Sequence, residues 1–455
     1  MTTTPLTTVL TPTGMLGYGY PVPDFWAALD EGVDIIVVDA GSTDPGPYML
    51  GLGSTLCTED AVTRDLTPML EAAATKHVPV IVSSAGGAGT DAQVDDLARL
   101  VDKIAQERGW RLRVATVYAD LAEETLLDLL EHERVQRNVR GELPTADDVR
   151  ASNGLVAQLG AEPFQRILEF TEPVDVIIAG RAYDPAPHAA WSMSQGVDPA
   201  LAWHSGKILE CGGACAEPKG GGVVARLHAD SFTVTPMSPG ARCTPLSVAA
   251  HTLYEKSRPD LLPGPDGVLD VSQCHYEAVD ERTVRVTGSR HHENEHPTLK
   301  AEGAAVVGHR AVFMGGVRDP ILIGQIDTFL DSLRRTLGGF HPELNTGEAE
   351  FHVHVYGRNG VMGPLEPETA VPFEIGVLAE VTAPTAEKAK SIASLARIGM
   401  LHLPYEGQIA TGGNFALPLN PMEASIGPVC RFSVYHVLDV TGLSPFPVRV
   451  MEAGR

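Results

Sequence analysis

Short apolar segments rich in β-branched residues alternate with helix-like stretches over the first part of the chain, and this alternation constrains the fold most strongly. A stripe of apolar residues at helical spacing, from Val94 to Ile104, lies between two of the segments. Buried strands that alternate with helices predict a parallel sheet covered on both faces, and therefore an α/β fold. The predicted strands are Asp34–Asp39, Val78–Ser83, Leu112–Tyr118 and Val174–Gly180.

The pattern changes along the rest of the chain. From about Lys207 the sequence is glycine-rich and predicts a more antiparallel part, and a helix over 321–337 is followed by a linker-like segment. We therefore predict a boundary near residue 345, with an α/β region over 1–345 and an α+β domain over 346–455. The elements predicted for the second domain are strands at 350–356, 373–381 and 429–440 and a helix at 385–403.

Charge and composition exclude several classes of partner. The chain of 455 residues has a formal net charge of −24 and no run of five Lys or Arg residues, so neither nucleic acid nor a membrane surface is expected to bind. Residues 1–13 lack the pattern of a secretory signal, and no apolar stretch is long enough for a membrane span. The six cysteines are few and unevenly spaced, which is typical of reduced thiols and predicts a cytoplasmic protein.

Polar residues follow each of the four predicted strands. Because the carboxyl ends of parallel strands lie at one edge of a sheet, ligands bind at that edge. We therefore expect these residues to form a common site, with backbone N–H groups of the glycine-rich loop available to an anion. The candidates are Asp39, Ser42, Thr43 and Asp44 at the end of the first strand, Ser83, Ser84, Gly86 and Gly87 at the end of the second, and Arg181 and Asp184 after the fourth; Asp120 is the polar residue after the third.

Each candidate also has a structural interpretation. The segment 83–91 is equally consistent with a tight turn in which Thr90 or Asp91 caps a helix. Arg181 either grips a substrate carboxylate or pairs internally with Asp184. Asp39 and Asp44 are candidates for a general base, for metal ligands or for hydroxyl binding, and equally for turn and cap residues.

Two further clusters contain side chains that could transfer a proton or bind a metal ion. Glu210 precedes Cys211 and a pair of glycines, so we consider Glu210 a candidate for proton transfer, whereas a buried structural thiol is the favoured interpretation of Cys211. Cys211 and Cys215 have no second cysteine pair at zinc-site spacing. The histidines in 291–296 are favoured as a polar loop, and His352 with His354 form a weaker metal or base candidate. We therefore predict no metal ligands, and the cofactor stays unassigned.

Five short motifs are present along the chain: Asp39–Asp44, Gly180–Pro185, Glu210–Gly213, Lys300–Gly303 and Gly316–Pro320, the last of which includes Arg318. Together they resemble the acyclic terpene utilisation (AtuA-like) family over most of the chain. This resemblance implies an N-terminal α/β region, a C-terminal ferredoxin-like domain, and a role in the catabolism of branched or terpenoid acids as CoA thioesters. The segment 211–218 departs from the usual family pattern, which suggests another acid as substrate.

No nucleophile elbow or dinucleotide fingerprint is present, so hydrolase and dehydrogenase functions are disfavoured. We expect a homo-oligomeric lyase, hydratase or isomerase that acts on a small carboxylic acid or an acyl-CoA thioester. Two alternatives stay open, a metal-dependent lyase or hydrolase that uses the Asp and His clusters, and a non-catalytic acyl-binding subunit. In the expected site the anion is bound by Arg181, Arg318 or the loop 83–89, and the proton is moved by Asp39, Asp44, Asp184 or Glu210.

Overall fold

The computed structural model describes residues 4–42, 46–138, 142–255 and 258–454. The chain forms two compact units. Unit 1 comprises Met1–Ala305 together with Phe432–Arg455, and unit 2 comprises Val306–Arg431. The sequence-based boundary near residue 345 lies inside unit 2, because two long strands carry the chain from one unit into the other and back.

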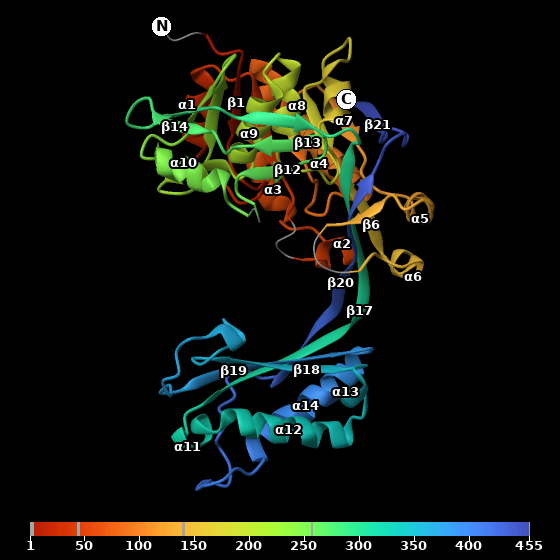
Figure 1. Cartoon of the computed structure of the whole chain (residues 1–455), viewed down its shortest axis with the longest axis vertical. Coiled ribbons are helices and arrows are strands. Elements are labelled where there is room, and N and C mark those ends of the chain that lie inside the picture. The colour runs from red at the N-terminus through yellow and green to blue at the C-terminus, as the bar shows by residue number, and fades with distance from the viewer. Residues whose placement is uncertain (1–3, 43–45, 139–141, 256–257, 455) are drawn as a thin grey trace. The chain divides into compact units, whose positions relative to one another are not determined.

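The centre of unit 1 is a parallel sheet of five strands (Figure 1). All pairings between neighbours in this part of the sheet are parallel, and nearly every residue in it is buried, which confirms the predicted α/β fold and the four predicted strands. The first strand was not predicted, because three of its five residues are threonines. In spatial order the strands are β1 (Thr7–Thr11), β2 (Ile35–Asp39), β3 (Val80–Ser83), β7 (Val176–Ala179) and β4 (Leu112–Val117).

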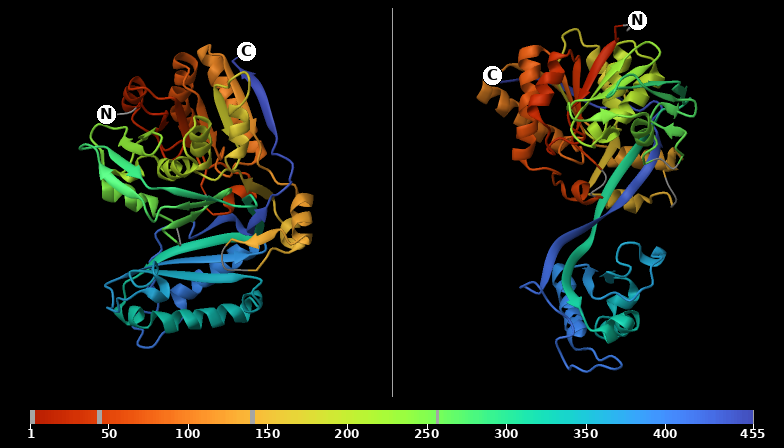
Figure 2. Two further views of the ribbon diagram at one scale, coloured as in Figure 1. Left: turned by 45° about the horizontal axis from the view of Figure 1, so that its top comes forward. Right: turned by 90° about the vertical axis from the view of Figure 1, so that its left-hand side faces the viewer.

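Helices cover both faces of this sheet (Figure 2). Alternate residues of one strand belong to two different cores, one on each face. Ile36 and Val38 pack with α1 (Val22–Asp30), α3 (Glu59–Lys76) and α4 (Asp91–Arg108), the last of which contains the predicted apolar stripe. Ile35 and Val37 belong to the opposite core. That core includes residues of α7 (Glu162–Leu168), α8 (Ala186–Ser194) and α9 (Pro199–Leu209).

Antiparallel strands extend the same sheet at both ends. On the β1 side follow β9 (Val223–Leu227), β10 (Phe232–Pro236), β15 (Val284–Thr287) and β14 (His275–Ala278), and β21 (Val448–Ala453) pairs with β4. Part of the predicted antiparallel region thus continues the parallel sheet, and its other strands belong to separate sheets. The remaining elements of unit 1 are α2 (Tyr48–Leu52), α5 (Glu123–Glu131), β5 (Val135–Arg137), α6 (Ala146–Arg150), β6 (Gly154–Gln158), η1 (Gly212–Cys215), β8 (Ala216–Glu217), β11 (Arg242–Cys243), α10 (Pro245–Thr252), β12 (Leu261–Pro263), β13 (Gly267–Asp270) and β16 (Arg290–Glu293).

Unit 2 is a sheet packed on helices, and the four elements predicted for the C-terminal part are all present. Its strands lie in the order β18-β19-β17-β20. Phe313, Phe329 and Ile392 belong to its core. Its elements are β17 (Thr298–Val317), α11 (Pro320–Gly324), α12 (Ile326–Phe340), α13 (Glu343–Thr346), β18 (Glu350–Tyr356), η2 (Gly363–Leu365), β19 (Ile375–Ala383), α14 (Ala386–His402) and β20 (Glu423–Asp439), of which β17 begins and β20 ends in unit 1.

Among the described residues, no helix is both long enough and apolar enough to cross a bilayer.

Shortening one side chain at the centre of the parallel sheet tests this packing. Ile81 in β3 is completely buried, so Ile81→Ala is expected to lower the free energy of unfolding by about 2–5 kcal/mol, through lost burial and the cavity left behind. Leu246→Ala in α10, at a side chain 78% exposed, is the control and should change it by less than about 0.5 kcal/mol. Urea unfolding followed by circular dichroism measures both; equal effects would contradict the assignment of Ile81 to the core.

Candidate functional site

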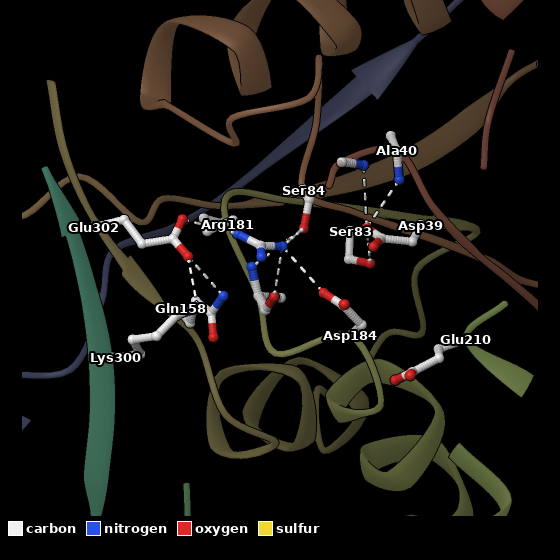
Figure 3. Close-up of polar contacts among 12 residues, drawn as sticks. Asp39, Ala40, Ser83, Ser84, Gln158, Arg181, Asp184, Glu210, Lys300 and Glu302 are labelled. Atoms are coloured by element: carbon white, nitrogen blue, oxygen red, sulfur yellow. Dashed lines mark hydrogen bonds and ion pairs between the residues drawn. The ribbon is translucent and has the colours of Figure 1, made fainter. Parts of the chain in front are cut away.

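The carboxyl ends of β2, β3 and β7 meet, and their polar residues form one cluster (Figure 3). Asp39 ends β2 and lies in register with Ser83 at the end of β3. The backbone N–H of Ser84 donates to the carbonyl of Gly180 at 3.0 Å, and that of Arg181 donates to the carbonyl of Gly89 at 2.9 Å. The loops after β3 and β7 are therefore held together by backbone hydrogen bonds.

Asp39 is a buried carboxyl group, 4% exposed. Its Oδ1 accepts hydrogen bonds from the backbone N–H of Ala40 at 2.9 Å and from the Ser83 hydroxyl at 3.0 Å. Burial, with a further contribution from the neighbouring Asp184, raises the pKa of Asp39 to about 8, although Arg181 and the serine hydroxyls oppose the shift. Asp39 therefore holds its proton at neutral pH.

Arg181 is the central cation of the cluster and is 3% exposed. Its Nη1 donates to Asp184 Oδ1 and to the Ser84 hydroxyl, both at 3.1 Å, and its Nε donates to Glu302 Oε2 at 3.2 Å (Figure 3). Burial opposes the charge of Arg181, but Glu302, Asp184 and Asp39 outweigh it and raise the pKa of the guanidinium. Arg181 is therefore charged and bound to protein groups.

Glu302, on β17, binds Arg181 from the side opposite Asp184 (Figure 3). Its Oε1 accepts from Lys300 Nζ and from Gln158 Nε2, each at 2.9 Å. The antiparallel pairing of β17 with β6 brings Lys300 into register with Gln158 and places Glu302 beside this pair. Burial alone would raise the pKa of Glu302, but Arg181 and Lys300 hold it below its ordinary value.

A second buried ion pair lies at the end of α9. Lys207 and Glu210 form a short ion pair in which both side chains are almost fully buried. Burial, and then the charge of Glu210, raise the pKa of the adjacent Cys211 to about 12. Cys211 is therefore a protonated thiol rather than a nucleophile.

Two cavities adjoin these carboxyl groups. The acid cavity, about 550 Å³, is lined by Asp39, Gly41, Ser42, Asp184 and Glu210 among others. The adjoining cavity, about 770 Å³, shares Asp184, Glu210 and Glu255 with it and adds Lys207, Lys300 and Tyr435. Asp184 and Glu210 thus line both cavities, whereas Asp39 lines the acid cavity and not the adjoining one.

One wall of the acid cavity is built from glycine backbone. A Cβ on Gly213 would lie 2.2 Å from the carbonyl oxygen of Gly220, and one on Gly14 would lie 2.7 Å from that of Cys211. Only glycine permits this approach. Lys219 lies on this wall, lines the acid cavity and is exposed. It was not predicted, although its position beside the run Gly220–Gly222 was a usable signal.

The glycine-rich loop after β3 is largely satisfied internally. The N–H of Gly87 donates to the carbonyl of Ser84, and Gly86 lines a third cavity together with residues of α3 and α4. The hydroxyl of Thr90 caps α4, as the structural interpretation of this loop expects. Ser83 and Ser84 support Asp39 and Arg181, and neither serine lines the acid cavity or the adjoining one.

Arg318 and Asp120 contact residues other than those of the cluster. Arg318 belongs to unit 2, where its guanidinium carbon lies 3.4 Å from the ring centroid of Phe373. Thr43 and Asp44 lie outside the described residues. Asp120, at the end of β4, accepts a hydrogen bond from the N–H of Asp91, and burial raises its pKa to about 6.

The predicted histidine loop is partly a strand. His291 and His292 lie in β16, because they pair with Leu269 and Val268 of β13. His291 Nε2 lies 3.5 Å from Asp266 Oδ1. Over the ranges that the structure describes, no group of three His, Cys, Asp or Glu side chains could hold a metal ion.

Comparison with known proteins identifies a family. The model of the family described as acyclic terpene utilisation family protein AtuA matches residues 57–413. No curated protein and no solved structure matches the chain.

The protonation of Asp39 predicts a pH dependence of stability. An unfolded aspartate has a pKa of about 3.9, so the contribution of the buried, protonated form is complete below about pH 4 and is lost as the pH rises through about 8. Asp39→Asn cannot ionise. Between pH 5 and 9 the wild type should therefore lose on the order of 2–5 kcal/mol relative to this variant, as measured by urea unfolding. The exposed Asp60→Asn is the control, and parallel curves for wild type and Asp39→Asn would contradict the assignment.

Proposed function

The chain belongs to the acyclic terpene utilisation family AtuA, and we propose that it is a lyase of the hydratase type acting on a small carboxylic acid or acyl thioester. One observation carries the proposal. A single cavity presents a buried carboxyl group with a raised pKa, Asp39, beside two carboxyl groups that are paired with cations, Asp184 and Glu210. Neighbouring carboxyl groups in different environments are the usual arrangement for an acid and a base in one active site.

The different environments of Asp39 and Asp184 suggest which of them is the acid and which is the base. In the elimination direction Asp184, which borders both cavities, takes the proton from the carbon next to the substrate carbonyl. Asp39 gives its proton to the hydroxyl on the following carbon, the C–O bond breaks, and a carbon–carbon double bond and water form. Hydration is the reverse, in which Asp39 accepts a proton from water and Asp184 returns one to carbon.

The substrate anion needs a cation that it can reach. Arg181, expected from the sequence to bind it, is buried among protein acceptors and lines neither cavity. Lys219 lines the acid cavity and is exposed, and among the described residues no ion pair holds it. We therefore assign the substrate carboxylate or thioester oxygen to Lys219 and a supporting role to Arg181.

Two other functions, isomerisation and acyl binding without catalysis, would leave different products. An isomerase would use the same acid and base but would release no water, so product analysis separates it from a hydratase. A non-catalytic acyl-binding subunit would return its ligand unchanged. The metal-dependent alternative has no support from the described residues, which contain no group of three candidate ligands.

For unit 2 we propose the ferredoxin-like topology. Its main elements follow the order β17, α12, β18, β19, α14, β20, which is the β-α-β-β-α-β sequence of that fold. The strand order β18-β19-β17-β20, with β19 antiparallel to both of its neighbours, supports the same assignment.

Removing the proposed acid tests the reaction. Asp39→Asn should lower kcat by about 10²–10⁴-fold, because asparagine cannot donate the proton. Wild-type dehydration should fall as the pH rises through about 8, where Asp39 ionises. Mass spectrometry of hydroxy acids, unsaturated acids and their CoA esters, incubated with the purified chain, measures turnover. Asp60→Asn is the matched control; ligand retained without conversion by the wild type would instead identify a binding subunit.

Removing the proposed anion contact tests the orientation of the substrate. Lys219→Ala should raise KM by about 10–100-fold, the range expected for loss of a charge-assisted hydrogen bond. Lys76→Ala, an exposed lysine paired with Asp30, is the control and should leave KM unchanged. Initial rates over a range of substrate concentrations give both values, and an unchanged KM for Lys219→Ala would exclude this contact.

A further inference from the structure

Glu302 is buried beyond Arg181, outside both cavities. Its side chain is 4% exposed, and three donors, from Arg181, Lys300 and Gln158, converge on its two oxygens. It lines neither the acid cavity nor the adjoining one, so it does not touch a substrate there. A fully satisfied buried carboxylate of this kind acts only through the groups that it holds.

We propose that Glu302 is a positioning residue that acts through Arg181: it fixes the guanidinium against Asp184 and balances part of its positive charge, so that this charge is not available to the proposed acid, Asp39. The inference rests on the proposed function of Asp39 as the acid. It extends that function to a residue on a different sheet, far away in the sequence.

The geometry around Arg181 supports this role of Glu302. Arg181 uses Nε for Glu302 and Nη1 for Asp184, so the planar guanidinium is held between two carboxylates (Figure 3). The same Nη1 also donates to the Ser84 hydroxyl. Planar groups held in this way have a fixed orientation. The position of Asp184 at the junction of the two cavities therefore depends on Glu302.

The distribution of charge around Arg181 also supports this role. Along Lys300, Glu302, Arg181 and Asp184 the charges alternate in sign, and each cation in the row already has a carboxylate partner. Asp39 is a further carboxyl group beside Asp184, and the charge of Arg181 is committed elsewhere. A buried carboxyl group without its own cation retains its proton.

Other polar and titratable groups also lie around Asp39, on several loops and element ends. In the described part of the chain Arg181 and Asp184 follow β7, Ser83 is the last residue of β3, and Ser84 follows it. Around the acid cavity lie Tyr18, Glu210, Cys211, Lys219, Tyr254 and Glu255. None of these groups is changed by a substitution at Glu302 or Lys300, so such variants isolate the row of alternating charges.

Two substitutions in this row should shift the ionisation of Asp39 in opposite directions. Glu302→Gln removes a negative charge and leaves Arg181 free to stabilise ionised Asp39, so the pKa of Asp39 should fall by about 0.5–1 unit, or about 3–10-fold in ionisation constant. Lys300→Gln removes the cation on the other side of Glu302, so the pKa of Asp39 should rise. A residue with a merely structural role would not produce opposite shifts.

The measurement is an NMR titration of the full chain labelled with ¹³C at the aspartate side-chain carboxyl, with Asp39→Asn used to assign the signal. Glu172→Gln, which removes an exposed carboxylate paired with Arg113, is the matched control and should leave the titration unchanged. If Glu302→Gln does not fold, Lys300→Gln, at a side chain 19% exposed, still tests the direction in which the pKa of Asp39 shifts.

The two proposals fail separately. Shifts of the same sign, or no shift, overturn the role of Glu302 whether or not the protein turns over a substrate. Opposite shifts in a protein that converts no acid or thioester support the role of Glu302 in setting the protonation of Asp39 and overturn only the assignment of the reaction. Where turnover is found, the alkaline limb of the pH–rate profile should move to lower pH in Glu302→Gln.

Discussion

The buried guanidinium of Arg181 is the interaction on which the rest of the site depends. It lies where the loops after β3 and β7 meet, and it joins them to β17 through Glu302. An ion taken out of water costs several kcal/mol, and this cost is recovered only if good partners surround it. Here the partners come from segments 97 and 121 residues away. The ion pair therefore forms only after the sheet and β17 have assembled, and it favours this one arrangement of the loops.

The charge balance around Arg181 explains why one carboxyl group differs from the others. Three cations, Arg181, Lys207 and Lys300, form ion pairs with three carboxylates, Asp184, Glu210 and Glu302, within the described residues. Asp39 is the fourth carboxyl group; it ends a strand of the parallel sheet and is 4% exposed. For a buried carboxyl group without its own cation, keeping a proton costs less free energy than ionising, and the pKa of Asp39 is therefore raised to about 8.

Patterns over short stretches of sequence predicted the strands and the helix that short-range interactions determine. The strands β2, β3, β4 and β7 and the stripe of α4 follow from apolar periodicity, and Asp39, Asp184 and Glu210, proposed from the sequence as site residues, line one cavity. β1 was missed because threonine-rich strands lack that periodicity. The boundary of unit 2 could not be located from composition, because β17 and β20 run through it without a linker.

What the sequence could not show depends on contacts between distant residues. Arg181 at a strand end looks like an anion-binding group until Glu302 is placed beside it, and the register of β17 against β6 decides that contact. Conversely, Lys219 looks like an ordinary surface lysine. It becomes a candidate for substrate binding because Gly14 and Gly213 allow backbone segments to pack closely without side chains beside the lysine, which lines the acid cavity. The buried Arg181 thus holds the loops of the site together, and the exposed Lys219 is the proposed contact for the ligand, because the guanidinium already has protein acceptors.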